Sequence, residues 1–88
     1  ANYNMNTGSN LDNQLSAQKA NVENLERQFN DLLRDLESNK ALLEVGAVSQ
    51  NTIDNMETQI ATAKSNLEQA KNQLKTLEER ISELEKKE

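Results

Sequence analysis

The chain has 88 residues, of which 34% are hydrophobic, and it contains one Phe, one Tyr and no Trp. A chain this short with so few large side chains cannot build a thick globular core, so its apolar residues must be buried along a narrow seam. The net charge of −5 comes from acidic and basic residues mixed along the chain, which argues against the clustered basic stripe of a nucleic-acid-binding face.

The first segment with a clear pattern begins at Leu11. The preceding residues, ANYNMNTGS, are rich in Asn and lack a helical period, so we expect residues 1–10 to be a flexible tail or linker. From Leu11 onward the seam positions alternate at spacings of four and three, which is typical of a coiled-coil helix. The pattern predicts a first helix over residues 11–45. Its ten seam positions, eight of them apolar, are Leu11, Leu15, Gln18, Val22, Leu25, Phe29, Leu32, Leu36, Asn39 and Leu43.

A loop with an unusual apolar content follows, in the stretch LLEVGAVSQNTIDN at residues 42–55. Gly46 suits the left-handed position that follows a helix C-terminus. Ser49 suits an N-cap, whose hydroxyl accepts a hydrogen bond from an amide of the next helical turn. We therefore expect a tip turn at 46–48 and a second helix over 49–86.

The second helix repeats the apolar period in a different phase. The seam positions of a seven-residue coiled-coil repeat are called a and d. Extending the repeat of the first helix through the loop places Ile53 at d, whereas the repeat of the second helix places it at a. A stammer in a continuous rod would absorb this shift. The shift coincides with helix-stop and helix-start residues, however, which favours two antiparallel helices. The seam positions of the second helix are Ile53, Met56, Ile60, Ala63, Leu67, Ala70, Leu74, Leu77, Ile81 and Leu84.

The predicted fold is therefore all-α, a two-helix antiparallel coiled-coil hairpin with both of its ends at one end of the rod. A turn near residue 46 places large side chains opposite small ones, as in Phe29 opposite Ala63, which permits close packing. Two polar residues occupy seam positions, Gln18 opposite Leu74 and Asn39 opposite Ile53. We interpret them as residues that set the register, with a polar contact for a partner as the alternative.

Catalytic chemistry has no obvious basis in the sequence. The chain contains no His, no Cys and no Gly-rich phosphate loop, and its acidic residues are predicted on solvent-exposed faces without a cleft. The carboxylates of Glu78, Glu79 and Glu83 would lie too far apart on a helix to hold a cation. No stretch of about 18 apolar residues is present that would span a membrane. We expect no catalytic residue, no metal site and no cofactor, which leaves a structural or interaction role.

The loop and the residues after it resemble a known family. The motif residues are Gly46, Ala47, Val48, Ser49, Ile53, Asp54, Ala61, Ala63, Leu67 and Ala70. Over residues 11–85 the chain resembles the helical hairpin of the periplasmic adaptor, or membrane fusion, proteins of the HlyD and MacA type. The resemblance implies a hexamer-like homo-oligomer whose hairpin tips dock against a TolC-type outer-membrane channel and bridge it to an inner-membrane transporter, for drug efflux or type I secretion. It also implies a periplasmic or extracytoplasmic location, with the parent protein anchored to the inner or cell membrane.

The resemblance also implies which residues bind the partner. In the family, tip recognition uses an Arg, a Leu four residues later and a Ser seven residues after that. Leu42 and Ser49 match the last two, whereas Ser38 stands at the Arg position. An atypical channel, or a Gram-positive cell without an outer membrane, would not require the Arg. We expect weak contacts at Ser38 and Asp54, and partner-binding tip residues at Leu42, Val45, Gly46, Ala47, Val48 and Ser49.

The apolar loop has a second interpretation, in which Leu42, Val45 and Val48 only close the end of the seam against water. Leu42 precedes the seam residue Leu43 and so lies beside the seam, where an apolar side chain favours a partner surface. For the whole chain the alternatives are a rod-like coiled-coil dimer with a stammer at Gly46 and a rigid spacer with no transport role.

Overall fold

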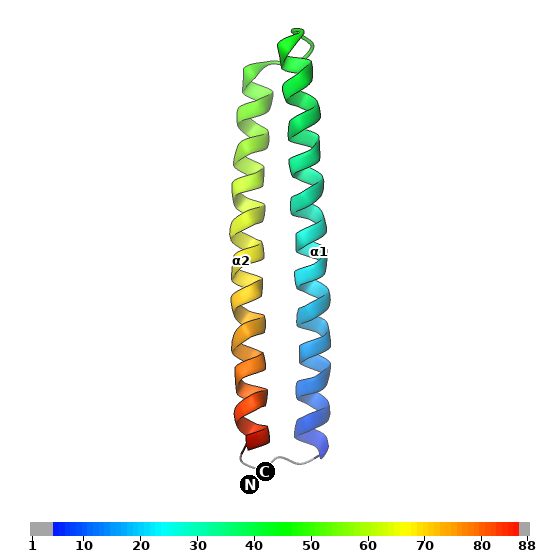
Figure 1. The fold of residues 1–88 in the computed structure, drawn as a ribbon, viewed down its shortest axis with the longest axis vertical. Helices are drawn as coiled ribbons and strands as arrows, with labels where there is room; N and C mark the ends of the chain where they lie inside the picture. The colour runs from blue at the N-terminus through cyan, green and yellow to red at the C-terminus, as the bar shows by residue number, and fades with distance from the viewer. Residues whose placement is uncertain (1–4, 87–88) are drawn as a thin grey trace.

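The computed structural model describes residues 5–86 and contains two helices, α1 (Met5–Glu44) and α2 (Gln50–Lys86), as shown in Figure 1. The helices run antiparallel and pack side by side, which confirms the predicted all-α hairpin. The molecule measures 65 × 14 × 13 Å and is a rod two helices wide. The continuous rod with a stammer at Gly46 is therefore wrong, because the chain reverses its direction at this turn.

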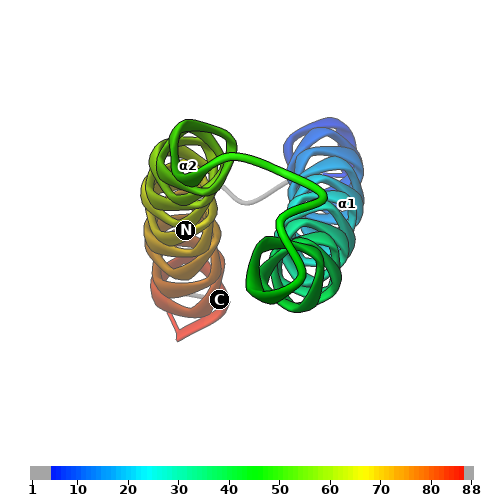
Figure 2. The same ribbon diagram turned by 90° about the horizontal axis from the view of Figure 1, so that it is seen from above.

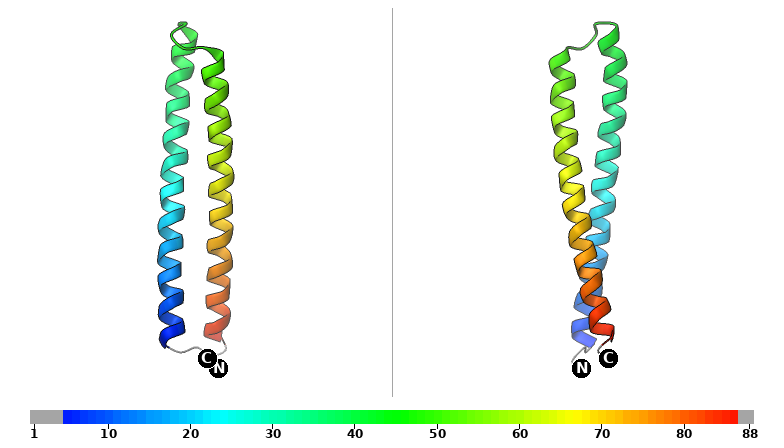
Figure 3. Two further views of the ribbon diagram at one scale, coloured as in Figure 1. Left: turned by 180° about the vertical axis from the view of Figure 1, so that it is seen from behind. Right: turned by 60° about the vertical axis from the view of Figure 1, so that its left-hand side comes forward.

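The two helices are inclined to each other rather than strictly parallel. In the right-hand view of Figure 3 the ribbons cross near the base, whereas in the left-hand view they lie next to each other. The view from above in Figure 2 shows the same inclination and the turn that joins α1 to α2. This arrangement is expected for helices whose seam repeats every 3.5 residues, because keeping the seam in contact winds the helices around each other.

The first helix begins six residues before the predicted start, because α1 includes residues 5–10. Our assignment of residues 1–10 to a flexible tail is therefore wrong for 5–10, and residues 1–4 lie outside the described part of the chain. Gly8 is buried and Leu84 packs against the base of the seam, so the end of α2 supports this extra length of α1. The apolar period could not reveal it, since the Asn-rich segment has no period of its own.

Burial follows the predicted seam closely. The buried hydrophobic side chains in the described part of the chain are Leu11, Val22, Leu36, Ile53, Leu67, Ala70, Leu77 and Ile81. All eight occupy predicted seam positions, and they come from both helices. Among the residues whose burial the structure describes, 8 and 10–86, no polar or charged residue is buried, so the interior of the rod is apolar.

Six of the eight buried residues gather into two separate groups along the rod, and Leu36 and Ile53 lie outside both groups, nearer the tip. The group that we call the basal cluster consists of Leu11, Leu77 and Ile81, with Leu15 and Leu84 packed against them. The group that we call the middle cluster consists of Val22, Leu67 and Ala70, with Leu25, Phe29 and Leu74 packed against them. Val22 and Ala70 were predicted to face each other, and they lie in the same cluster.

One ion pair joins the two helices in the part of the chain that the structure describes. Lys71 Nζ lies 3.9 Å from Glu26 Oε1, beside the middle cluster. The other ion pairs connect residues of α1 three positions apart, Arg34 with Asp31 and Lys40 with Glu37. Exposed pairs of this kind contribute only about 0.2–1 kcal/mol each, so the apolar seam provides most of the packing energy.

Candidate functional site

The tip begins with a glycine-dependent end of α1. The amide of Ala47 donates to the carbonyl oxygen of Leu42 at 2.8 Å, and the amide of Gly46 donates to the carbonyl oxygen of Leu43 at 3.0 Å. Together with the φ of +77° at Gly46, these bonds form a Schellman motif. A Cβ atom at Gly46 would meet nothing within 4 Å, so the position needs glycine for its backbone angle rather than for space.

The second half of the tip starts α2 with a side-chain cap. The amide of Thr52 donates to Ser49 Oγ at 3.2 Å, which confirms the predicted N-cap. The two hydroxyls are also in contact, with Ser49 Oγ 3.1 Å from Thr52 Oγ1. Asp54 accepts a hydrogen bond from Gln50 Nε2 at 3.0 Å, so its carboxylate is engaged within its own helix.

The position of Val48 favours the second interpretation of the apolar loop, in which this side chain closes the end of the seam. It directly precedes the N-cap and is half-buried, whereas Ile53 in the next turn is only 2% exposed. An apolar residue before the N-cap commonly packs against the fourth residue of the helix, and Ile53 occupies that position here. We therefore assign Val48 to the closure of the seam. This agrees with the interpretation that part of the apolar loop shields the seam from water.

Two large apolar side chains at the tip remain exposed. Val45 is 78% exposed and Leu42 is 43% exposed. Ser38 and Ala41 are also exposed, and the spacings of three and four residues place all four positions on one face of the end of α1. We call Ser38, Ala41, Leu42 and Val45 the tip patch. Our sequence analysis missed Ala41, although its position three residues after Ser38 and four before Val45 was visible in the sequence.

The tip patch belongs to one helix only. None of its four residues carries a charge, and the first turn of α2 presents the polar side chains of Gln50, Asn51 and Asp54 instead. Figures 1 and 3 show that α1 reaches farther than α2 at this end of the rod. The tip patch thus lies on the more strongly projecting of the two helices.

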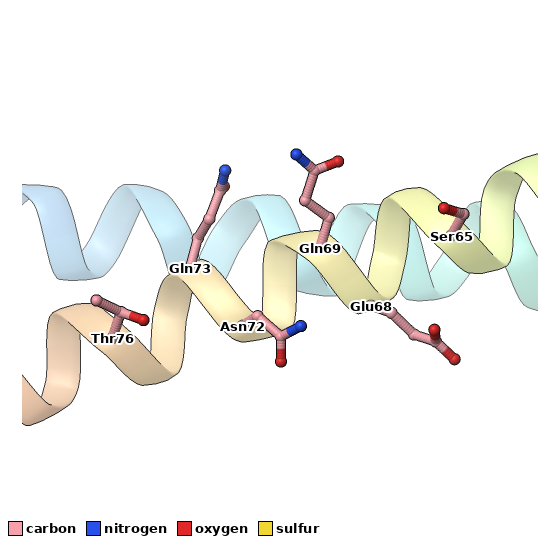
Figure 4. Close-up of a pocket in the computed structure, with 6 residues that line it drawn as sticks. All are labelled: Ser65, Glu68, Gln69, Asn72, Gln73 and Thr76. Carbon is pink, nitrogen blue, oxygen red and sulfur yellow. The ribbon is translucent and has the colours of Figure 1, made fainter.

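The hollows described away from the tip are open to solvent. One open hollow lies on α2 alone, and Figure 4 shows that its side chains fan out from the helix rather than converge on one point. Within residues 5–86, His, Cys, Asp and Glu side chains form no group of three that is suited to a metal ion. Over the same range neither helix combines the length and the apolar character of a membrane span. The residues around the hollow are Ser65, Glu68, Gln69, Asn72, Gln73 and Thr76.

The structure thus separates the predicted tip residues into two groups. Gly46 and Ser49 form the turn and the helix caps, and Val48 is half-buried before the N-cap, whereas Leu42 and Val45 present their side chains to solvent. Ala47 is exposed, and its amide donates a hydrogen bond within the turn. Ser38 lies with Leu42 and Val45 in the tip patch on α1. Asp54 lies on α2 instead and accepts a hydrogen bond from Gln50. The chain matches no protein-family model, no curated protein and no solved structure.

Proposed function

We propose that the chain is the helical hairpin of a membrane fusion protein, or periplasmic adaptor, and that its tip patch contacts an outer-membrane channel or another helical partner. The single observation that carries the proposal is the exposure of two large apolar side chains, Leu42 and Val45, together on the projecting end of the rod. Large apolar side chains gathered on a surface tend to mark interaction sites. The family resemblance of the Gly46–Ser49 turn supports the same assignment.

The hairpin shape supports this role as well. Met5 and Lys86 lie at the same end of the rod, and the tip lies at the other end of its 65 Å length. A domain that carries both ends could therefore hold the tip well away from its own surface. On this proposal the parent protein is anchored to the inner or cell membrane, and the hairpin acts outside the cytoplasm without catalysing a reaction.

A single tip patch offers only a small binding energy. Complete burial of a Val or Leu side chain contributes about 1.5–3 kcal/mol, and part of this is lost in ordering the contact. Several tips held together in a hexamer-like assembly would bind a channel with several ends far more tightly than one tip, because each contact after the first is intramolecular. The proposal therefore combines a weak tip contact with a homo-oligomeric parent protein.

Ser38 indicates what kind of partner surface this tip would fit. It is exposed within the tip patch and presents a hydroxyl where the resembling adaptors carry an Arg. A guanidinium at this place would favour an acidic partner surface through bidentate hydrogen bonds. With Ser38 in its place, we expect an apolar, uncharged partner surface that does not depend on an ion pair.

Binding of a detergent-solubilised TolC-type channel to the immobilised hairpin tests the proposal. Val45→Glu and Leu42→Arg place a charge in the contact, and we expect each to weaken binding by at least tenfold. Asn51→Arg is the matched control, since Asn51 is exposed at the same end of the rod but lies on α2. Equal binding by all variants would favour the rigid-spacer alternative.

A further inference from the structure

The seam is interrupted between its basal and middle clusters. The basal cluster ends at Leu15 on α1, the middle cluster begins at Val22, and no residue belongs to both. Gln18 is the seam position between them, and the register places it opposite Leu74. The polar layer, named here for Gln18, therefore divides the apolar contact between the helices about a third of the way along α1 from its start at Met5.

The polar layer is incompletely hydrogen-bonded. Gln18 Oε1 is buried and has no hydrogen-bond partner. A buried acceptor without a partner has lost its hydrogen bonds to water and gained none in return, which destabilises the closed arrangement. The layer also borders a shallow surface groove that Gln14, Gln73 and Arg80 help to line.

Elsewhere in the described part of the seam, no buried side-chain oxygen or nitrogen lacks a hydrogen-bond partner. Asn39, the second polar seam residue, donates from Nδ2 to the carbonyl oxygen of Asp35 at 2.8 Å and is therefore bonded within its own helix. The middle cluster is flanked by the ion pair between Glu26 and Lys71. At the far end the turn joins the two helices covalently. The base is the only end of the described hairpin where the helices can separate without opening a turn.

We infer that Gln18 is a joint, at which the basal cluster opens as a unit while the middle cluster remains closed. Opening as far as this layer exposes Gln18 Oε1 to water, and the hydrogen bonds regained offset part of the lost apolar contact. Opening beyond it would break the middle cluster without such a gain. Local opening in contiguous cooperative units is a general property of proteins, and the polar layer defines the boundary of one here. The joint would let a rod held at its base change direction, whatever its tip binds.

Hydrogen exchange of backbone amides tests the joint. We expect amides of residues 11–17 and 77–84 to exchange at least tenfold faster than those of 22–29 and 67–74, with a step at Gln18. Gln18→Leu should slow exchange in the basal segments at least tenfold and change the middle segments by less than threefold. Gln28→Leu is the control, because Gln28 is exposed on the same helix. A smooth gradient without a step, or equal slowing of both segments by Gln18→Leu, would overturn the inference.

Distances between spin labels provide a second measurement that needs no change at Gln18. Labels at Asn10 and Ser82 report on the base, and labels at Glu23 and Gln69 report on the middle, since all four positions are exposed. We expect a broad distance distribution for the basal pair and a narrow one for the middle pair. Equally narrow distributions for both pairs would contradict the inference.

Discussion

The amide of Ala47 donates to the carbonyl oxygen of Leu42 at 2.8 Å, so the backbone of Leu42 is fixed by the turn while its side chain remains 43% exposed. The two roles of this residue are thus separable. A substitution that retains the backbone retains the turn, and it changes only the surface offered to a partner. This separation is why charged variants of the tip patch are informative about binding rather than folding.

Gly46→Ala should lower the free energy of unfolding by about 1–2 kcal/mol, which is the usual cost of a left-handed backbone angle for a residue with a Cβ atom. No steric contribution is expected, because a Cβ atom there meets nothing within 4 Å. Urea unfolding followed by circular dichroism measures the change. An unaltered midpoint would mean that the turn does not hold Gly46 at a φ of +77° in solution.

Ser49→Ala should cost about 1 kcal/mol, because it removes the oxygen that accepts the hydrogen bond from the Thr52 amide. Ser49→Asp should retain most of the stability, since a carboxylate also caps a helix N-terminus. Ser65→Ala is the control, as Ser65 is exposed in the interior of α2, where Ala is the better helix former. A loss of stability with Ser65→Ala equal to that with Ser49→Ala would argue against the cap.

Ala70→Leu should destabilise the hairpin by about 1–3 kcal/mol through overpacking. Ala70 is 3% exposed in the middle cluster beside Val22, so added methyl groups would push the helices apart. Ala61→Leu adds the same atoms at an exposed position of α2 and should have little effect. Thermal unfolding of the two variants distinguishes them, and equal melting temperatures would contradict the small-against-large packing of the seam.

Leu33→Glu should raise the stability slightly, by about 0.2–1 kcal/mol. Leu33 is an exposed apolar residue, and it lies one heptad nearer the tip than Glu26. The register of the pair between Glu26 and Lys71 therefore places position 33 next to Lys64. Leu33→Gln is the control, because Gln has nearly the same shape as Glu but no charge. In 1 M salt the stability gained by Leu33→Glu should be lost, whereas the stability of Leu33→Gln should not fall in this way.

The fold was predictable because its determinants are local. The strict apolar period identified both helices, and the eight buried side chains all fall on it. Gly46 and Ser49 identified the turn, since each residue type suits one specific backbone role. The phase shift at Ile53 distinguished a hairpin from a rod without any knowledge of tertiary contacts.

The remaining features depend on packing that no local pattern encodes. Residues 5–10 are helical beside the end of α2, although their sequence has no apolar period. The loop residues Val45 and Val48 are the same amino acid in similar sequence surroundings, yet only Val45 is largely exposed. The unpaired Gln18 oxygen likewise depends on which atoms lie across the seam. Distinguishing such cases requires coordinates.

Photocrosslinking from the tip tests whether the tip patch contacts a partner. A photoreactive amino acid at Val45 of the parent protein, with the same amino acid at Asn51 as the control, compares the two sides of the tip within cells. We expect an adduct with an outer-membrane channel or another helical partner from position 45 and little or none from position 51. No adduct from position 45, or equal adducts from both positions, would contradict a partner-binding surface on the end of α1.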